Sequence, residues 1–474
     1  MNLRRWLTVG IGVKRWLLVA FAGLLLLALG LAHVLRQVTA SLDPADPVQA
    51  VLGLLTFQFL PYQARGVLLG SIGVGLFLAG AYRLVRALVD PFALWDRDQP
   101  MVEVIYQKRF LARGPRIVAI GGGTGLSTLL RGLKEHTSNL TAVVTVADDG
   151  GSSGVLREEL GIPAVGDIRN CVVALADSEA LMGRLLQYRF PGTGPATAAE
   201  PEPGKASAAD AADAPVDGPF AAAESGLGGH AVGNLLLAAL VQLEAGDFEQ
   251  GVREMNRVLA VRGSVVPATG TVLTLHARLE DGTEIQGQTR IGKQSRVDRV
   301  WVTPPDVRPT SDALRAIEDA EMIVLGPGSL FTSLLPALMV PGIREAIAAS
   351  GALVVFACNV ATQPGETAGF DLADHVDALA RHGAAHLPHV VLANNRFDAA
   401  PPAHWRGEPV RLRWPPSSGD PGNPAMRLVL DDLVDPANAH HHDAERLASA
   451  VMRVWDRDGG RRRRPSAARA ERSA

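Results

Sequence analysis

Residues 116–175 read RIVAIGGGTGLSTLLRGLKEHTSNLTAVVTVADDGGSSGVLREELGIPAVGDIRNCVVAL, and this stretch decides the fold. The apolar run 117–120 stops in the glycine turn 121–125 (Gly-Gly-Gly-Thr-Gly), and leucines at helical spacing follow at once. A second apolar run, 142–146, ends in the polar turn 148–154 (Asp-Asp-Gly-Gly-Ser-Ser-Gly). Both turns should meet at one end of a parallel sheet, where open α/β sheets bind their ligands. The pattern predicts a Rossmann-like α/β fold with a mostly parallel sheet.

The glycine turn predicts an anion site. The first backbone N–H groups of a helix have no partner within the helix, and the helix dipole favours negative charge there, so a nucleotide phosphate is the simplest ligand. No Gly-Lys-Ser/Thr follows the turn, which excludes a P-loop. Leu126 stands where the dinucleotide fingerprint, counted from Gly121, has its third glycine, so NAD is a weaker interpretation.

The paired carboxylates Asp148 and Asp149 allow three interpretations. One of them could contact a ribose hydroxyl, as the acidic residue of a Rossmann unit does. Both could hold Mg²⁺ beside a phosphate. A turn-forming Asp-Gly pair would explain Asp149 but not Asp148.

Two further glycine-rich motifs contribute polar side chains. The segment 165–170 (Val-Gly-Asp-Ile-Arg-Asn) begins a helix, and Arg169 is unfavourable beside the positive helix end unless an anion lies nearby. Capping by Asp or Asn is the alternative for its neighbours. In the motif 228–234, His230 and Asn234 are four residues apart and share a helix face. A structural pair and a ligand-binding pair explain these two equally well.

The strand-turn-helix pattern returns twice. The apolar run 321–325 leads into Gly-Pro-Gly-Ser at 326–329, and the run 353–357 leads into a polar segment that contains Asn359. Glycines let a backbone approach a ligand closely, and Ser and Thr hydroxyls can donate to it. Between these motifs, residues 271–290 alternate around Asp281-Gly282, which predicts a β-hairpin that continues into 298–302 as a small antiparallel subregion.

Composition bounds the class of protein. The chain has 474 residues, of which 47% are hydrophobic, so it can form two or three domains. A formal net charge of −3 gives no global signal for nucleic-acid binding. The two cysteines, Cys171 and Cys358, lie in apolar segments, which favours reduced thiols in a cytosolic domain. No Cys/His spacing indicates zinc, and the triple 440–442 (His-His-His) is expected in a solvated loop.

The first 96 residues predict a transmembrane hairpin with spans at about 16–35 and 67–89, each near the length that crosses a bilayer. Cations flank both outer ends, so both termini and the main domain should be cytoplasmic. A cleaved signal peptide and buried soluble helices are the alternatives. Residues 97–113 form a charged connector to the domain 114–455. The Ala/Pro/Gly-rich residues 191–225 are expected to be a disordered insertion, and 456–474 a disordered basic tail.

No catalytic nucleophile is assigned: residues 150–154 (Gly-Gly-Ser-Ser-Gly) have the spacing Gly-x-Ser-x-Gly, but the sequence has no Cys/His signature and no His-Glu-x-x-His. Any reaction would therefore be a group transfer that depends on positioning and on metal electrostatics. Whether the protein is an enzyme stays open at this point.

Seven collinear motifs carry a family resemblance: IGGGTGLSTLLRGL, VTVADDGGSSGVLREELG, GDIRNCVVALAD, GHAVGNLLLAAL, ATGTVLTLHARLEDG, IVLGPGSLFTSLLPALMVPGI and CNVATQPGETAGFDLADHV. Over roughly residues 114–395 the chain resembles the bacterial gluconeogenesis factor family, a branch of the 2-phospho-L-lactate transferase superfamily. That family usually has Ser-Phe where this chain has Ala231-Val232, so the serine hydroxyl is missing here, while His230 and Asn234 are retained.

The resemblance implies a UDP-sugar ligand such as UDP-N-acetylglucosamine and a role in cell shape and wall synthesis on gluconeogenic carbon sources. It suggests the cell-wall synthesis machinery as a partner, and the sequence is compatible with a homo-oligomer. The preferred hypothesis is a UDP-sugar-binding regulator at the membrane; the alternative is a Mg²⁺-dependent transferase of a phosphate-linked group. The expected ligand-binding residues are Gly121, Gly122, Gly123, Thr124, Gly125, Asp148, Asp149, Ser152, Ser153, Asp167, Arg169, Asn170, His230, Asn234, Gly326, Gly328, Ser329, Thr332, Asn359, Thr362 and Gln363, with Asp148 and Asp149 as candidate metal ligands.

Overall fold

A computed structural model describes residues 111–176, 180–191, 226–294, 296–397, 407–415 and 426–459, together with the single residues 24, 28, 61, 64, 71 and 75. The chain divides into two compact units, Met1–Phe110 and Leu111–Ala474, and the fold below is that of the second. The predicted membrane hairpin, the insertion from residue 192 to 225 and the tail from residue 460 onward lie outside the described residues, apart from the single residues just named.

Among the described residues, no single helix is both long enough and apolar enough to cross a bilayer. One bent pair of helices, Leu330–Leu338 and Ile343–Ser350, has the necessary length and composition when its two members are taken together.

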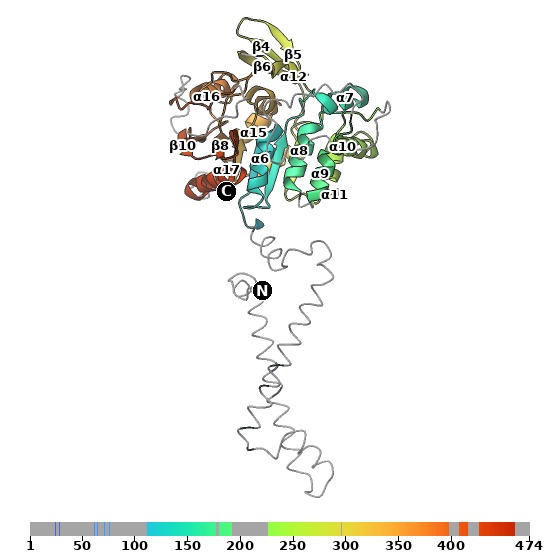
Figure 1. Ribbon diagram of the computed structural model, residues 1–474, viewed down its shortest axis with the longest axis vertical. Helices are drawn as coiled ribbons and strands as arrows, with labels where there is room; N and C mark the ends of the chain where they lie inside the picture. Colours follow the sequence, from blue (N-terminus) through green and yellow to red (C-terminus); the bar gives the residue numbers. More distant parts are fainter. Residues whose placement is uncertain are drawn as a thin grey trace, which may run out of the picture. The chain divides into compact units, whose positions relative to one another are not determined.

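The main sheet is parallel throughout and has seven strands in the order β10-β9-β8-β7-β1-β2-β3 (Figure 1). Its strands are fully or largely apolar because helices cover both faces of such a sheet. They are β1 (Ile117–Gly121), β2 (Leu140–Val144), β3 (Ser264–Pro267), β7 (Met322–Leu325), β8 (Leu353–Ala357), β9 (Val390–Asn394) and β10 (Arg427–Asp431). The central strand β1 pairs with β2 on one side and β7 on the other. The predicted Rossmann-like α/β class is confirmed.

Helices surround the sheet, and the chain direction places their amino ends near the turns that follow the strands. The helix α6, after β1, packs against both α8 and α17, while α10 packs on α11 and α13 on α15. The helices are α6 (Gly123–Leu133), α7 (Gly151–Leu160), α8 (Gly166–Leu175), α9 (Ala180–Gln187), α10 (Val232–Leu243), α11 (Phe248–Val258), α13 (Ser311–Asp319), α14 (Leu335–Leu338), α15 (Ile343–Ser350), α16 (Leu372–Arg381) and α17 (Ala444–Val454).

A second, antiparallel sheet contains β4 (Thr274–Leu279), β5 (Glu284–Gln286) and β6 (Val297–Thr303), which confirms the predicted hairpin subregion. Figure 1 shows it at the top of the domain, together with the short helix α12 (Gln288–Ile291). The alternation in the sequence predicted that the second strand of the hairpin continues to residue 290. This prediction is wrong, because β5 ends at Gln286. Gly287, at φ +100°, turns the chain out of the strand and begins α12.

The carboxyl-terminal part corrects two expectations. The histidine triple is not in a solvated loop, because it forms the end of β12 (Asn438–His442), which pairs with β11 (Val434–Asp435). His442 is buried, and its Nε2 lies 3.2 Å from the carbonyl oxygen of Cys358. The helix α17 continues into a π-helical turn, Trp455–Gly459, so ordered structure passes the boundary placed at residue 455.

Candidate functional site

The glycine turn after β1 lies against the glycine turn after β7. A Cβ on Gly125 would lie 2.8 Å from the backbone N of Gly328 and 2.8 Å from the carbonyl oxygen of Pro327, so only glycine allows this approach. Gly123 has φ +66°, a conformation that glycine adopts without strain. No side chain caps the start of α6 at Gly122. The first backbone N–H groups of α6 therefore have no capping side chain, which is what the predicted anion site requires; the site itself stays a prediction.

One aspartate lies against this turn, and a second lies beside the start of α8. The α-carbon of Gly122 packs against the carboxylate of Asp167 and the methyl group of Thr145. A Cβ on Gly166 would lie 3.0 Å from Oδ2 of Asp148, and the Gly166 N–H donates to Oγ of Ser153 at 3.0 Å. The structure thus brings the turns after β1 and β2 and the start of α8 together, as the sequence analysis predicted.

The two candidate metal ligands differ in their surroundings. Oδ1 of Asp149 accepts hydrogen bonds from both the N–H and the hydroxyl of Thr289, each at 2.8 Å, and so binds α12 to the turn after β2. Oδ1 of Asp148 accepts from the N–H of Gly150 at 2.9 Å. Over the described part of the chain, no group of three or more His, Cys, Asp or Glu side chains is arranged around one point as metal ligands. A Mg²⁺ ion would fit here only through Asp148 and the oxygens of a bound phosphate, a ligand set that Mg²⁺ commonly accepts.

Ser152, His230 and Asn234 form a buried hydrogen-bonded chain. Nδ2 of Asn234 donates to Oγ of Ser152 at 3.0 Å, and Oγ of Ser152 lies 3.0 Å from Nδ1 of His230. The serine hydroxyl donates to Nδ1 when the His230 proton is on Nε2, and accepts from Nδ1 in the other tautomer. Ser152 lies in the first turn of α7 and the other two residues at the start of α10. These hydrogen bonds therefore join motifs that are far apart in the sequence.

Arg169 is buried and runs beside the α10 segment. Its Nη2 donates to Oδ1 of Asn170 at 2.9 Å, and its aliphatic stem packs against Gly233, where a Cβ would lie 2.8 Å from Cγ. Gly233 is thus needed to seat the arginine, a role that the sequence pattern alone did not reveal.

On the side of β7 and β8, several predicted ligand residues position the backbone. Asn359 accepts from the N–H of Gly328 at 3.1 Å and donates to its carbonyl oxygen at 3.0 Å, which fixes the turn 326–328. Thr362 accepts from the N–H of Glu408 at 2.9 Å and so ties a later segment to the end of β8. Gln363 donates to Oγ of Ser329 at 2.8 Å.

Glu366 is a site residue that the sequence reasoning missed. Its Oε1 accepts from the hydroxyl of Thr332 at 2.5 Å, and its Oε2 accepts from the N–H of Phe331 at 3.2 Å. Burial raises the pKa of Glu366, and the hydrogen bonds from Thr332 and Phe331 oppose that rise. The signal was the carboxylate within Gln-Pro-Gly-Glu-Thr, since a charged residue in a turn after a buried strand requires a partner.

Buried polar atoms without a hydrogen-bond partner flank this region in the described residues: Oγ1 of Thr145, Oδ1 of Asn234 and Oε1 of Gln363. An unsatisfied buried polar atom destabilises a fold by about 1–3 kcal/mol. Oδ1 and Oε1 are acceptors, so they require a hydroxyl or N–H donor from a ligand or water. Sugar hydroxyls supply donors of this kind.

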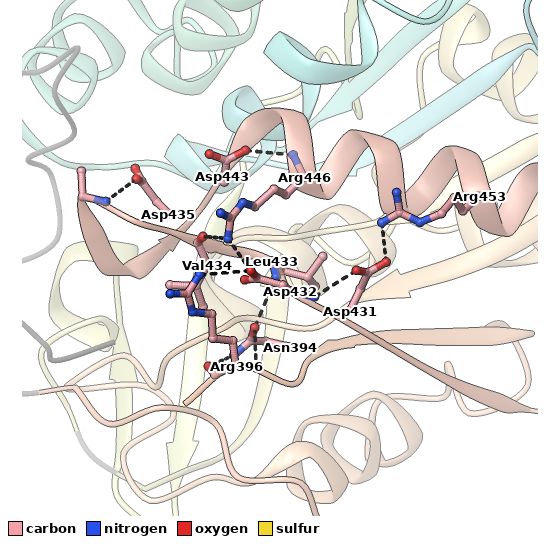
Figure 2. A network of polar contacts seen from close by, with 11 residues as sticks. Asn394, Arg396, Asp431, Asp432, Leu433, Val434, Asp435, Asp443, Arg446 and Arg453 are labelled. Atoms are coloured by element: carbon pink, nitrogen blue, oxygen red, sulfur yellow. Dashed lines mark hydrogen bonds and ion pairs between the residues drawn. The ribbon is translucent and has the colours of Figure 1, made fainter. Parts of the chain in front are cut away.

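The other half of the carboxyl edge of the sheet contains charged side chains (Figure 2). Oδ2 of Asp432 accepts from Nη1 of Arg396 at 3.2 Å and from Nη1 of Arg446 at 2.5 Å. Asp431 pairs with Arg453 on α17. A hollow of about 480 Å³ opens beside this network at the ends of β9 and β10.

The fold and the site define an α/β protein with a polar, ligand-type region at the carboxyl edge of a doubly wound sheet. The sequence profile of the family "2-phospho-L-lactate transferase CofD" matches residues 117–406, and the chain belongs to this family. Within it, the chain is similar to gluconeogenesis factors, which confirms the resemblance found from the motifs.

Two relatives illustrate the similarity. A "Putative gluconeogenesis factor" of Nostoc sp. is 41% identical over 459 residues, which are 95% of this chain and 92% of that protein. The "Gluconeogenesis factor" of Bacillus subtilis is 43% identical over 355 residues, which are 72% of this chain and 98% of that protein. A crystal structure from Bacillus halodurans, of a UPF0052 family member, has 38% identity and a TM-score of 0.59, with 72% of this chain and 99% of that chain covered.

Proposed function

We propose that this protein is a UDP-sugar-binding regulator of the gluconeogenesis factor type, with a role in cell shape and envelope synthesis on gluconeogenic carbon sources. The observation that carries the proposal is the uncapped start of α6 at Gly122, together with the buried, unpartnered acceptors Oδ1 of Asn234 and Oε1 of Gln363. The N–H groups at the start of α6 would bind a phosphate, and sugar hydroxyls would donate to the two acceptors. UDP-N-acetylglucosamine offers both in one molecule.

In this proposal each motif has a separate role. The backbone N–H groups of residues 123–125 hold the diphosphate, and Asp148 with the phosphate oxygens holds Mg²⁺, which would neutralise the phosphate charge. His230, in the tautomer with its proton on Nε2, would donate to the sugar or to a phosphate oxygen. Asn359 and Glu366 keep the turns after β7 and β8 in position and need not contact the ligand.

We further propose that the domain is held at the cytoplasmic face of the cell membrane by the hairpin 1–96, where it would act on the cell-wall synthesis machinery. The basic flanks of both apolar runs support this orientation. The similarity to the Nostoc relative, which covers 95% of the chain, includes most of this region. A membrane-impermeant thiol label should react with cysteines placed in 36–66 in intact cells and not with cysteines placed in the domain; the reverse pattern would refute the orientation.

A second candidate function is a Mg²⁺-dependent transfer of a phosphate-linked group. It is favoured by the family, 2-phospho-L-lactate transferase CofD, and by Asp148, whose carboxylate lies beside Gly166 at the start of α8. The Ser152–His230 pair could then move a proton during the transfer.

Calorimetric titration of the full-length protein in detergent with UDP-N-acetylglucosamine, with and without Mg²⁺, separates the two functions when the mixture is also analysed for product. Micromolar binding without turnover supports the regulator, and product formation supports the transferase. Binding of a deazaflavin without affinity for UDP-sugars would refute the regulator. The variant Asp148→Asn should lose about tenfold in Mg²⁺-dependent affinity. The matched control, Asp281→Asn at the exposed tip of the β4–β5 hairpin, should bind as the wild type does.

A further inference from the structure

The hollow at the ends of β9 and β10 lies on the same edge of the sheet as the glycine turns. Its lining, within the described residues, consists of Asn395, Arg396, Phe397 and Asp432, and its volume is about 480 Å³. Three strand spacings separate β9 from β1, which is roughly 14 Å at about 4.8 Å each. With the diphosphate at residues 123–125, the uridine part of an extended nucleotide sugar would have to bridge this span.

A carboxamide fixes the walls of this hollow. Oδ1 of Asn394 accepts from the N–H of Arg396 at 3.2 Å and from the N–H of Leu433 at 3.3 Å, and its Nδ2 donates to the carbonyl oxygen of Arg396 at 2.6 Å (Figure 2). One side chain thus holds the turns after β9 and after β10 against each other. The lining residues that follow both strands are therefore preorganised.

The lining offers hydrogen-bonding groups of opposite kinds. Oδ1 of Asp432 is buried and has no hydrogen-bond partner, although Oδ2 of the same carboxylate binds two arginines. Such an acceptor is satisfied only when a ligand or a water molecule donates to it. Asn395 is exposed, and its carboxamide makes no hydrogen bond within the described part of the chain, so its Nδ2 can donate to a ligand oxygen.

Phe397 completes the lining with an aromatic ring, and the residue is 46% exposed. Exposed aromatic rings that line a polar hollow bind planar ligands by stacking. The guanidinium of Arg396 adds a second planar group and positive charge. The four lining residues therefore suit a flat ring that has an N–H next to a carbonyl oxygen.

We propose that this hollow binds the uracil ring of the nucleotide sugar, an inference that rests on the proposed function above. The ring N3–H donates to Oδ1 of Asp432, a neighbouring ring carbonyl accepts from Asn395, and the ring stacks on Phe397. Cytosine has a lone pair at N3 and would place it against the carboxylate. Because an unpaired buried polar group opposes binding, the hollow should discriminate between the two bases.

Titration of the full-length protein with UDP and with CDP tests this inference. The wild type should bind UDP at least about tenfold more tightly than CDP. Asp432→Asn, whose amide can donate to cytosine N3, should bring the two affinities within about threefold of each other. The control Asp431→Asn changes the neighbouring carboxylate, which pairs with Arg453 instead, and should keep the wild-type ratio.

The variant Phe397→Ala covers the case in which Asp432→Asn does not fold, because it removes an exposed ring. It should weaken UDP and CDP alike by about tenfold. The inference is overturned if Asp432→Asn keeps the wild-type ratio, if Phe397→Ala binds UDP as the wild type does, or if the wild type binds UDP and CDP equally. In those cases binding of UDP-N-acetylglucosamine would still support the proposed function. No binding of any uridine nucleotide by the wild type would refute both.

Discussion

The two halves of the carboxyl edge of the sheet use different chemistry. In the half formed by the turns after β1, β2 and β7, the important contacts are made by glycine backbone, as between Gly125 and Gly328. In the half formed by the ends of β9 and β10, they are made by long charged side chains, as between Asp432, Arg396 and Arg446. We call these the glycine half and the arginine half.

The difference shows what each half can tolerate. Backbone N–H groups bind an anion only where the chain is free of side chains, so the glycine half should be intolerant of a single added methyl group. Charged side chains hold their geometry through ion pairs and respond to pH and to charge substitution. The following three predictions test this contrast, in order of decreasing effect.

The largest effect is expected in the glycine half from Gly125→Ala. The new Cβ would meet backbone atoms of Pro327 and Gly328 at 2.8 Å, and backbone cannot move aside as a flexible side chain can. We expect a loss of about 3 kcal/mol in the free energy of unfolding, measured by urea denaturation, together with loss of UDP-sugar binding.

The control for this variant is Gly183→Ala in α9, where the added Cβ would have a single neighbour, Cγ1 of Val173, at 4.0 Å. Its stability should be unchanged or up to about 1 kcal/mol higher, because alanine is the better helix former. Native stability of Gly125→Ala would show that the two glycine turns are not as tightly packed as described.

A second, pH-dependent effect is expected next to the arginine half, at His442 on β12. Burial lowers the pKa of His442 from 6.5 to about 4, and the hydrogen bond to Cys358 opposes this only in part. Between pH 6.5 and about 4, His442 binds a proton in the unfolded chain and stays neutral in the folded chain. Stability therefore falls as pH drops from 6.5 to 4, by about 2 kcal/mol between pH 7 and pH 5 from this residue.

The measurement compares urea denaturation at pH 7 and pH 5 for the wild type and His442→Gln. The variant should lose about 2 kcal/mol less between these two pH values than the wild type does. His375 and His382, whose pKa values are also lowered by burial, contribute equally to both proteins. The exposed His386→Gln should retain the wild-type pH dependence, and an identical dependence for His442→Gln would contradict the prediction.

The smallest effect is expected where the antiparallel sheet meets the glycine half. Thr289→Val removes one of the two hydrogen bonds to Asp149 and keeps the other, from the backbone N–H. We expect a loss of about 1 kcal/mol, seen as roughly fivefold faster amide exchange at residues 288–291. Thr283→Val, at the far tip of the hairpin, should leave exchange at these residues unchanged. Equal exchange in both variants would mean that Asp149 does not hold α12 in place.

The fold and several parts of the site could be predicted because they depend on local pattern. Apolar runs that end in glycine-rich or polar turns placed β1, β7 and β8, and the alternation around Asp281-Gly282 placed the hairpin. The strand β2 was predicted at 142–146 and is found at Leu140–Val144. The burial of the histidine triple could not be predicted, because its polar side chains carry no local signal of the strand pairing with Val434. The short helix α12 was missed for a similar reason: a four-residue helix has too few turns to show a periodicity.

The sequence by itself determined the α/β class, the positions of the polar turns and the family, since strand and turn preferences act between near neighbours. Tertiary structure alone decided which side chains meet. It paired Ser152 with His230, used Asn359 to fix the Gly328 turn, and buried Glu366 against Thr332. It also placed the hollow near Asp432 on the same edge as the glycine turns. These contacts join residues from about thirty to eighty positions apart, and such contacts form only when the strands pack side by side into one sheet.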